Sequence, residues 1–376
     1  MAALQGVRVL DFSTLLPGPL ATLLLAEAGA EVIKIERPGG GDDMRAYEPW
    51  LDSGGERIGL PFALLNRGKR SLALDLKSPD AMATLRPLLE QADVVVEQFR
   101  PGVMARLGLD WNSLQRINPR LILCSITGYG QNGPKSAIAA HDLNYLADSG
   151  LLSLVADGTG SPVLPPALLA DIGGGAYPAV INVLLALRQR DLTGRGVHLD
   201  VSMSDNLFPL EFFALAQGWS GHGWPRANEG MTCGGSPRYG LYRCADGRFL
   251  AVAPLEQKFW DNLCAAIELP DAWRDDRRDP AGTRAAVAAC IAGRTSAEWL
   301  ERFAGLDVCC NVVASVEEAS RDPHFLARGV FGRQVAAGQM TMSALPMPID
   351  PAVRTSQTLA TAPRLGEFDP AAMSKR

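Results

Sequence analysis

The sequence predicts an α/β protein with a mostly parallel β-sheet covered by helices, followed by a second, smaller α+β domain. Three observations lead to this fold class. Runs of β-branched residues alternate with helix-forming segments over residues 1–216, which is the pattern of βαβ units. The length of 376 residues suits one large and one smaller domain. Residues 217–238 are rich in Gly, Trp, Pro, Asn and Ser, which is typical of a linker.

The elements of the first region follow from local patterns. Residues 7–12 alternate as a strand, and Ser78 with Pro79 is a good N-cap and first residue for a helix. Further strands are expected at residues 31–36, 72–76, 93–98, 121–126 and 197–201. Helices are expected at residues 20–27, 78–91, 101–107, 111–117, 171–190 and 204–216. The alternation of the two implies a parallel sheet with helices on its faces.

The second region differs in its pattern. Residues 239–319 begin with a hairpin around Asp246 and Gly247 and continue with helical segments, so we expect a small α+β domain there. These helices are expected at residues 257–267, 283–292 and 296–303. Residues 320–376 contain short strands at 330–335 and 339–342.

Composition excludes several classes of protein. The net charge of −5 argues against a nucleic-acid partner. The N-terminus lacks the pattern of a signal peptide, and the longest apolar stretch is too short to span a membrane. The seven cysteines are scattered and form no CxxC pair, so we expect no metal site and a reducing, cytoplasmic setting. Motifs of the GxGxxG, GxSxG, HExxH and P-loop types are missing.

Two residues are the main candidates for chemistry. His141 follows a Gly-rich loop, and an imidazole is the natural proton carrier near neutral pH. Asp171 precedes three glycines at an expected helix start, where its amides could stabilise an oxyanion and the glycines could admit a substrate. A hydrogen-bonding loop histidine and an aspartate N-cap are the ordinary structural alternatives, and both stay open. Our hypothesis is that the two side chains face each other across one substrate carbon.

Charged residues elsewhere suggest a ligand crevice. Glu256 begins a helix of the second domain, where an acidic side chain commonly interacts with the helix dipole. Basic residues recur at or near strand ends, and the ligand crevice of an open α/β sheet lies at the carboxyl ends of its strands. As a set they suggest an acidic ligand such as a phosphorylated nucleotide, although each alone could be a surface charge. These residues are Arg37, Arg67, Lys69, Arg70, Arg100 and Arg106.

Long motifs in a consistent order resemble the family III CoA-transferases, also called the CaiB/BaiF family. They are GVRVLDFSTLLPGPLATLLLAEAGAEVIKIERPGGGD, NRGKRSLALDLK, VEQFRPGVMARLGLD, NPRLILCSITGYGQNGP, DIGGGAYPAVINVLLALRQRDLTGRG and DPHFLARGVF. The segments HDLNYLADSG and YRCADGRFLAVAPLEQKFW resemble the α-methylacyl-CoA racemase branch. The resemblance departs from that branch at Ala140, in residues 158–166 and near Gly366, which bears on the choice of substrate.

The resemblance implies a fold and a set of roles. The fold is an interlocked homodimer, in which each subunit has a Rossmann-like large domain, completed by residues 320–376, and a small domain. His141 and Asp171 would be the acid/base groups, and Glu256, supplied by the partner subunit, would orient His141. Residues that match positions near bound coenzyme A are Arg37, Arg100, Arg106 and Tyr145, and we expect Phe99, Arg67, Lys69 and Arg70 to bind it as well.

Two reactions remain open. A racemase would invert the α-carbon of a 2-methylacyl-CoA thioester by two-base proton transfer through an enolate. A CoA-transferase would use Asp171 as a nucleophile that carries acyl groups and CoA, and His141 would then be incidental. Neither needs a prosthetic group, because coenzyme A is part of the substrate. A non-catalytic CoA-binding protein would not need both residues.

Overall fold

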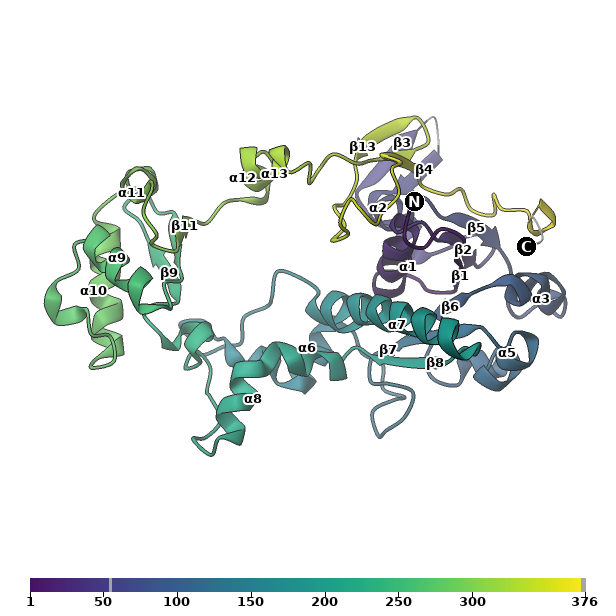
Figure 1. The fold of residues 1–376 in the computed structure, drawn as a ribbon, viewed down its shortest axis with the longest axis horizontal. Coiled ribbons are helices and arrows are strands. Elements are labelled where there is room, and N and C mark those ends of the chain that lie inside the picture. Colours follow the sequence, from purple (N-terminus) through teal and green to yellow (C-terminus); the bar gives the residue numbers. More distant parts are fainter. Residues whose placement is uncertain (54–55, 373–376) are drawn as a thin grey trace. The chain divides into compact units, whose positions relative to one another are not determined.

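The computed structural model describes residues 1–53 and 56–372, which form two compact units (Figure 1). The first unit consists of Met1–Ser149, Pro166–Phe208 and Pro323–Arg376, and the second of Gly150–Pro165 and Pro209–Asp322. The predicted division into domains at residues 1–216, 217–238, 239–319 and 320–376 remains a prediction. Its residues 54–55 and 373–376 lie outside the described residues.

A six-stranded parallel sheet forms the centre of the first unit. Its strands are β1 (Arg8–Asp11), β2 (Glu31–Glu36), β5 (Arg70–Ala73), β6 (Val94–Glu97), β7 (Ile122–Thr127) and β8 (His198–Ser202). They lie in the order β5-β2-β1-β6-β7-β8, and every neighbouring pair is parallel. Numbered consecutively, this is the 3-2-1-4-5-6 order of a doubly wound sheet, with its switch point between β1 and β6. The predicted parallel α/β sheet is confirmed.

Helices cover both faces of this sheet (Figure 1). On one face, α3 (Ala81–Gln91) and α5 (Trp111–Ile117) pack into a core that includes Leu10, Ile33 and Val95 of the strands. On the other face, α1 (Pro17–Glu27) contacts α7 (Tyr177–Thr193). Nearly every residue of α1 is buried, including Leu20 and Leu23–Leu25, as expected for a helix that is apolar all round. The remaining helices of this unit are α2 (Leu60–Asn66), α4 (Val103–Arg106), α6 (Asp142–Ser149) and α13 (Pro323–Ala327).

Two helix predictions differ from the structure at their ends. The N-cap assigned to Ser78 is wrong, because Asp80 precedes the first residue of α3, Ala81, while the carbonyl of Ser78 accepts the amide of Ala81 in a preceding turn. The single helix expected at residues 204–216 is a 3₁₀-helix, Asp205–Glu211, followed by α8 (Phe212–Trp219). Pro209 lies inside the first piece, where it cannot donate a helical hydrogen bond.

One continuous helical stretch, Ala170–Thr193, is long and apolar enough by length and composition to cross a membrane. Core helices of water-soluble proteins pass the same test, and 44% of the most apolar window of this stretch is buried within the protein. Among the described residues no other helix meets the criterion. The stretch begins as a π-helix over Ala170–Ala176 before it becomes α7.

The second unit has its own sheet and core. The strands β9 (Gly240–Arg243), β10 (Phe249–Val252) and β11 (Cys310–Val312) are antiparallel, and the expected hairpin is the β9–β10 pair. Trp260 and Trp299 are fully buried in its core. The helices of this unit, besides α8, are α9 (Gln257–Ala266), α10 (Pro280–Ala292), α11 (Ser296–Phe303) and α12 (Val316–Ser320).

The C-terminal segment returns to the first unit. Its strands β12 (Gln334–Ala337), β13 (Met340–Ser343) and β14 (Leu359–Thr361) form a small sheet that contacts α2. Phe368 is buried in the core beside α3. A further hairpin pairs β3 (Trp50–Ser53) with β4 (Glu56–Gly59).

Candidate active site

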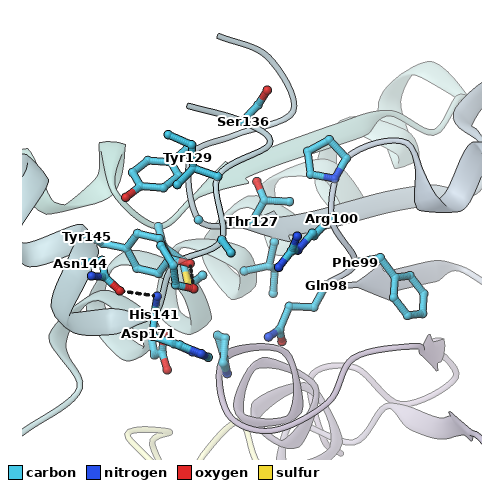
Figure 2. A pocket seen from close by; sticks show the side chains of 18 of the residues that line it. Gln98, Phe99, Arg100, Thr127, Tyr129, Ser136, His141, Asn144, Tyr145 and Asp171 are labelled. Carbon is cyan, nitrogen blue, oxygen red and sulfur yellow. Dashed lines mark hydrogen bonds between the residues drawn. The ribbon is translucent and has the colours of Figure 1, made fainter. Parts of the chain in front are cut away.

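A cavity of about 350 Å³ lies in the first unit at the carboxyl ends of its strands (Figure 2). Its wall includes Leu15 from the loop after β1, Gln98 after β6, Thr127 at the end of β7 and Met203 after β8. The β1 and β6 contributions place it at the switch point of the doubly wound sheet, which is where ligands bind in such folds. The fold therefore brings this cavity to the expected crevice.

His141 and Asp171 both line this cavity, and Figure 2 draws them close together at one end of it. His141 is exposed and directly precedes α6, and its backbone amide donates to Oδ1 of Asn144 at 3.0 Å. Asp171 is half-buried in the first turn of the π-helix. π-Turns of this kind frequently occur at functional sites. The two predicted acid/base residues thus share one cavity.

The electrostatic surroundings of Asp171 favour its protonated form. Burial raises the pKa of its carboxyl to about 6, and the neighbouring carboxylate of Asp142 adds to this rise, while His141 opposes it. A carboxyl group with a pKa this close to neutrality can both accept and return a proton under physiological conditions.

Asp142 ties the two candidate residues together. Its buried Oδ1 accepts hydrogen bonds from the amides of Ala170, at 2.7 Å, and Asp171, at 2.9 Å. The expectation that these helix-start amides stabilise an oxyanion is therefore wrong, since both already donate to Asp142. The first amide of α6, that of Asp142 itself, has no acceptor among the described residues and lies next to His141.

The glycines after Asp171 serve packing within the chain. A Cβ atom on Gly174 would lie 2.3 Å from the carbonyl oxygen of Met203, and one on Gly175 would lie 3.1 Å from Cβ of Pro17. The expectation that Gly174 and Gly175 admit a substrate is therefore wrong, because the space beside them is occupied by other parts of the chain. These glycines let the π-helix approach the loop after β8 and the start of α1.

Three predicted coenzyme A contacts line the same cavity, namely Phe99, Arg100 and Tyr145. The backbone amide of Phe99 donates to Glu97 at 2.8 Å, which fixes the turn after β6. Tyr145 is buried, and its hydroxyl donates to the carbonyl of Ala140 at 2.8 Å. Burial raises the pKa of Tyr145 to about 12, so the phenol stays neutral. Arg100 is therefore the cation that the predicted set contributes to this cavity.

The other predicted basic residues lie outside this cavity. Arg37 is exposed and pairs with Asp43, and Arg106 is exposed on the last turn of α4. Arg70 pairs with Glu31 and lies over the ring of Phe368. Arg67 is almost fully buried and pairs with Glu27 at 3.0 Å.

Lys69 belongs to a buried group of four charges, which we call the buried charge cluster: Asp11, Lys34, Asp42 and Lys69. Lys69 Nζ lies 3.1 Å from Asp11, and Lys34 Nζ lies 3.0 Å from Asp42. Both ammonium groups also donate to backbone carbonyls: Lys34 to that of Ser13, in the loop between β1 and α1, and Lys69 to that of Pro19, in the first turn of α1. Lys69 therefore connects the end of β1 with the first turn of α1 inside the protein, and Lys34 holds the loop between them.

Glu256 lies in the second unit. It is exposed at the N-cap position of α9, where its side chain makes no capping hydrogen bond. The role predicted for it remains a prediction.

Several lining residues were not identified from the sequence, among them Gln98, Thr127 and Asn144. Gln98 is oriented by its Oε1, which accepts the amide of Gly18 at 3.0 Å. Gln98 and Thr127 end or directly follow expected strands, so the rule that ligands bind at carboxyl strand ends could have found both. In the described ranges, 1–53 and 56–372, no group of three or more His, Cys, Asp and Glu side chains could hold a metal ion.

The fold and the cavity define a doubly wound α/β protein with a His–Asp pair at its switch point, and comparisons identify the family. The sequence profile of CoA-transferase family III matches residues 4–368. The alpha-methylacyl-CoA racemase of Homo sapiens is 37% identical over 353 residues, covering 92% of this chain and 86% of that protein. The acetyl-CoA:oxalate CoA-transferase of Acetobacter aceti is 33% identical over 358 residues, covering 92% of this chain and 88% of that protein.

A solved structure agrees with these relatives. The crystal structure of a CaiB/BaiF family protein from Brucella suis superposes with a TM-score of 0.82 at 29% sequence identity, covering 97% of this chain and 96% of that one. The chain belongs to CoA-transferase family III, as its sequence motifs predicted. Both racemases and CoA-transferases are among its relatives.

Proposed function

We propose that this protein is a racemase that inverts the α-carbon of 2-methylacyl-CoA thioesters. The observation that carries the proposal is the presence of His141 and Asp171 in one cavity, with the pKa of Asp171 raised to about 6. Inversion needs two groups that can each exchange a proton near neutral pH, and an imidazole and this carboxyl meet that need. The identity of 37% to the human racemase supports the same activity.

The proposed reaction moves one proton off the α-carbon and another onto it. One of the two groups takes the α-proton, the electron pair moves into the thioester as an enolate, and the other group delivers a proton to the opposite face. The enolate oxygen needs a hydrogen-bond donor. The amide of Asp142 at the start of α6 is free to donate and adjoins His141, so we assign this role to it.

Coenzyme A is proposed as the handle of the substrate and not as a prosthetic group. Phe99, Arg100 and Tyr145 line the cavity and are its proposed contacts there. Two exposed guanidinium groups on segments that follow β2 and β6 are the proposed phosphate contacts, those of Arg37, which also pairs with Asp43, and of Arg106.

We further propose that the protein is a homodimer in which Glu256 of the partner subunit orients His141. The support is an apolar stripe on the exposed side of α7, where Ile181, Leu185 and Leu192 are 57%, 63% and 71% exposed. Apolar stripes of this kind mark protein–protein interfaces, and a second copy of the chain would cover this one.

A CoA-transferase is the second candidate function. The half-buried carboxyl of Asp171 is also suited to a nucleophile that forms an anhydride with an acyl group. The identity of 33% to a CoA-transferase supports this second function. It differs from the racemase in making no use of His141.

Isotope exchange separates the two reactions. The protein is incubated with a 2-methylacyl-CoA in heavy water, and deuterium at the α-carbon is followed by mass spectrometry. We expect exchange with inversion, its loss in both His141→Ala and Asp171→Ala, and its reduction in Glu256→Gln with the dimer intact by sedimentation. Transfer of CoA to an added carboxylic acid without exchange, together with trapping of Asp171 by hydroxylamine, would establish the transferase instead.

A further inference from the structure

The loop between β1 and α1 contains a residue in an unfavourable backbone conformation. Leu15 has a φ of 62°, which lies in the left-handed region that bulky non-glycine residues rarely adopt. Leu15 is half-buried and is one of the residues that line the candidate active-site cavity. A strained residue persists only where its surroundings enforce it, and such residues gather at functional sites.

The surroundings of Leu15 do enforce this conformation. Its amide donates to both carboxylate oxygens of Asp42, at 3.1 and 3.2 Å. Asp42 is 1% exposed and is held in turn by Lys34 at 3.0 Å. Lys34 also fixes the carbonyl of Ser13, two residues before Leu15, at 2.7 Å. The buried charge cluster therefore holds the loop by hydrogen bonds at two places, at the carbonyl of Ser13 and at the amide of Leu15.

Holding a loop with buried charges has a cost in free energy. Burying four charges costs desolvation energy that their mutual attraction offsets only with good geometry, and apolar packing would serve stability as well or better. A glycine at position 15 would adopt the same φ without strain. The combination is understandable if the leucine side chain has to point into the cavity, and if the loop has to stay fixed when a ligand arrives.

We propose that Leu15 is a substrate-contacting residue that packs against an alkyl group of the bound thioester, and that Asp42 is the positioning residue that holds it there. This inference rests on the proposed binding of acyl-CoA in the cavity and applies equally to racemase and transferase chemistry. The alkyl group belongs either to the acyl chain or to the pantetheine arm, and ligands of different length distinguish the two.

The test measures binding, so that it does not depend on which reaction occurs. Unreactive thioethers, S-methyl-CoA and S-hexyl-CoA, are titrated by calorimetry into the protein and two variants. Leu15→Asn keeps a side chain of similar size that tolerates the left-handed conformation but makes it polar, and Leu15→Gly removes it. We expect either variant to weaken binding of S-hexyl-CoA roughly 5- to 30-fold, with the midpoint of thermal unfolding changed by less than about 4 °C.

The comparison of ligands locates the contact. A loss confined to S-hexyl-CoA assigns Leu15 to the acyl chain, and an equal loss for both thioethers assigns it to the arm. Adenosine 3′,5′-bisphosphate, the nucleotide part of coenzyme A, is the control and should bind unchanged. Unchanged binding of both thioethers in both Leu15 variants would overturn the proposal. Failure of the unmodified protein to bind any of these ligands would instead contradict the proposed function.

The role of Asp42 is tested by a double-mutant cycle. Asp42→Asn keeps a hydrogen-bond acceptor but removes the charge that pairs with Lys34. We expect it to weaken S-hexyl-CoA binding about tenfold in the unmodified protein and less than about twofold when Leu15→Gly is already present. Equal losses in the two backgrounds would mean that Asp42 acts on the structure generally and not through Leu15.

Discussion

Asp142 shows how one side chain can set both the position and the proton affinity of its neighbour. Its carboxylate accepts the amides of Ala170 and Asp171 and lies close enough to raise the pKa of Asp171. The hydrogen bonds fix the start of the π-helix, and the charge makes ionisation of Asp171 less favourable. Geometry and pKa at Asp171 therefore depend on the same residue.

The pH dependence of the reaction follows from this arrangement. Asp171 must be ionised to remove a proton, and its pKa of about 6 exceeds the ordinary value of 3.8. For the enantiomer from which Asp171 removes the proton, kcat/KM should fall below about pH 6. Asp142→Asn keeps an acceptor for the two amides but removes the negative charge, so the fall should move to lower pH. Profiles of kcat/KM for each enantiomer measure this, and an unmoved profile would contradict it.

The π-helix that carries Asp171 depends on close contact with the loop after β8. The place of a Cβ on Gly174 is 2.3 Å from the carbonyl of Met203, and Asn206 donates to the carbonyl of Gly174 at 2.8 Å. This contact between two backbone segments cannot relax by a side-chain rotation. The element therefore has a fixed position relative to the sheet.

We predict that Gly174→Ala lowers the free energy of unfolding by about 2–4 kcal/mol and reduces α-proton exchange. Gly158→Ala is the matched control, because no atom lies within 4 Å of a Cβ there and its φ is outside the positive range. Its effect should stay within about 0.5 kcal/mol. Urea denaturation of both variants decides the matter, and equal stability of the two would exclude a tight contact at Gly174.

At the scale of elements, the sequence was informative where a strand or helix carries a long uniform pattern. The buried strands β6 and β7 and the helix α7 were predicted from such runs. Element ends were not, because Ser78 forms a turn before α3, in which its hydroxyl accepts the amide of Asp80 and its carbonyl accepts the amide of Ala81. Local pattern does not show which backbone groups a turn has already used.

In the candidate site, His141 and Asp171 could be predicted from their residue types. The surroundings of the other candidate residues could not, because they depend on contacts between distant parts of the chain. The basic residues of the run NRGKR were expected near a ligand crevice. Lys69 is nevertheless buried against Asp11, and Arg67 against Glu27, because strand pairing brings acidic residues from distant parts of the chain to them. The strained conformation of Leu15 likewise arises from Asp42, twenty-seven residues away.

At the scale of the whole molecule, Glu27 connects helix α1 with the C-terminal segment of the chain. This buried carboxylate at the end of α1 pairs with Arg67 and with Arg333, and its backbone carbonyl accepts the amide of Thr355 at 2.8 Å. Arg333 also donates to the side chain of Thr355 at 3.0 Å. The C-terminal segment is thus anchored to the first unit through a buried ion pair.

Glu27→Gln should leave the buried guanidinium group of Arg67 and the half-buried one of Arg333 without this counter-charge, and leaving a buried charge unpaired costs about 3–5 kcal/mol. We expect a fall in the free energy of unfolding of that size and faster proteolysis of the C-terminal segment under native conditions. Glu90→Gln is the control, since Glu90 forms an exposed pair with Arg86 in which the side chains are 50% and 59% exposed, and such pairs contribute at most about 1 kcal/mol. Similar effects of the two changes would contradict the anchoring role.

The hydrogen bonds of Asp142 also close a loop. The residues that they join, Asp142 with Ala170 and Asp171, are 28 and 29 positions apart, and the intervening Gly150–Pro165 belongs to the second unit. Residues inserted into or deleted from Gly150–Pro165 would leave the two hydrogen bonds of Asp142 intact. The entropic cost of closing a longer loop grows only with the logarithm of its length. The placement of His141 and Asp171 relative to each other therefore does not depend on the length of Gly150–Pro165. This segment can change in sequence and length while the proposed acid/base pair is kept.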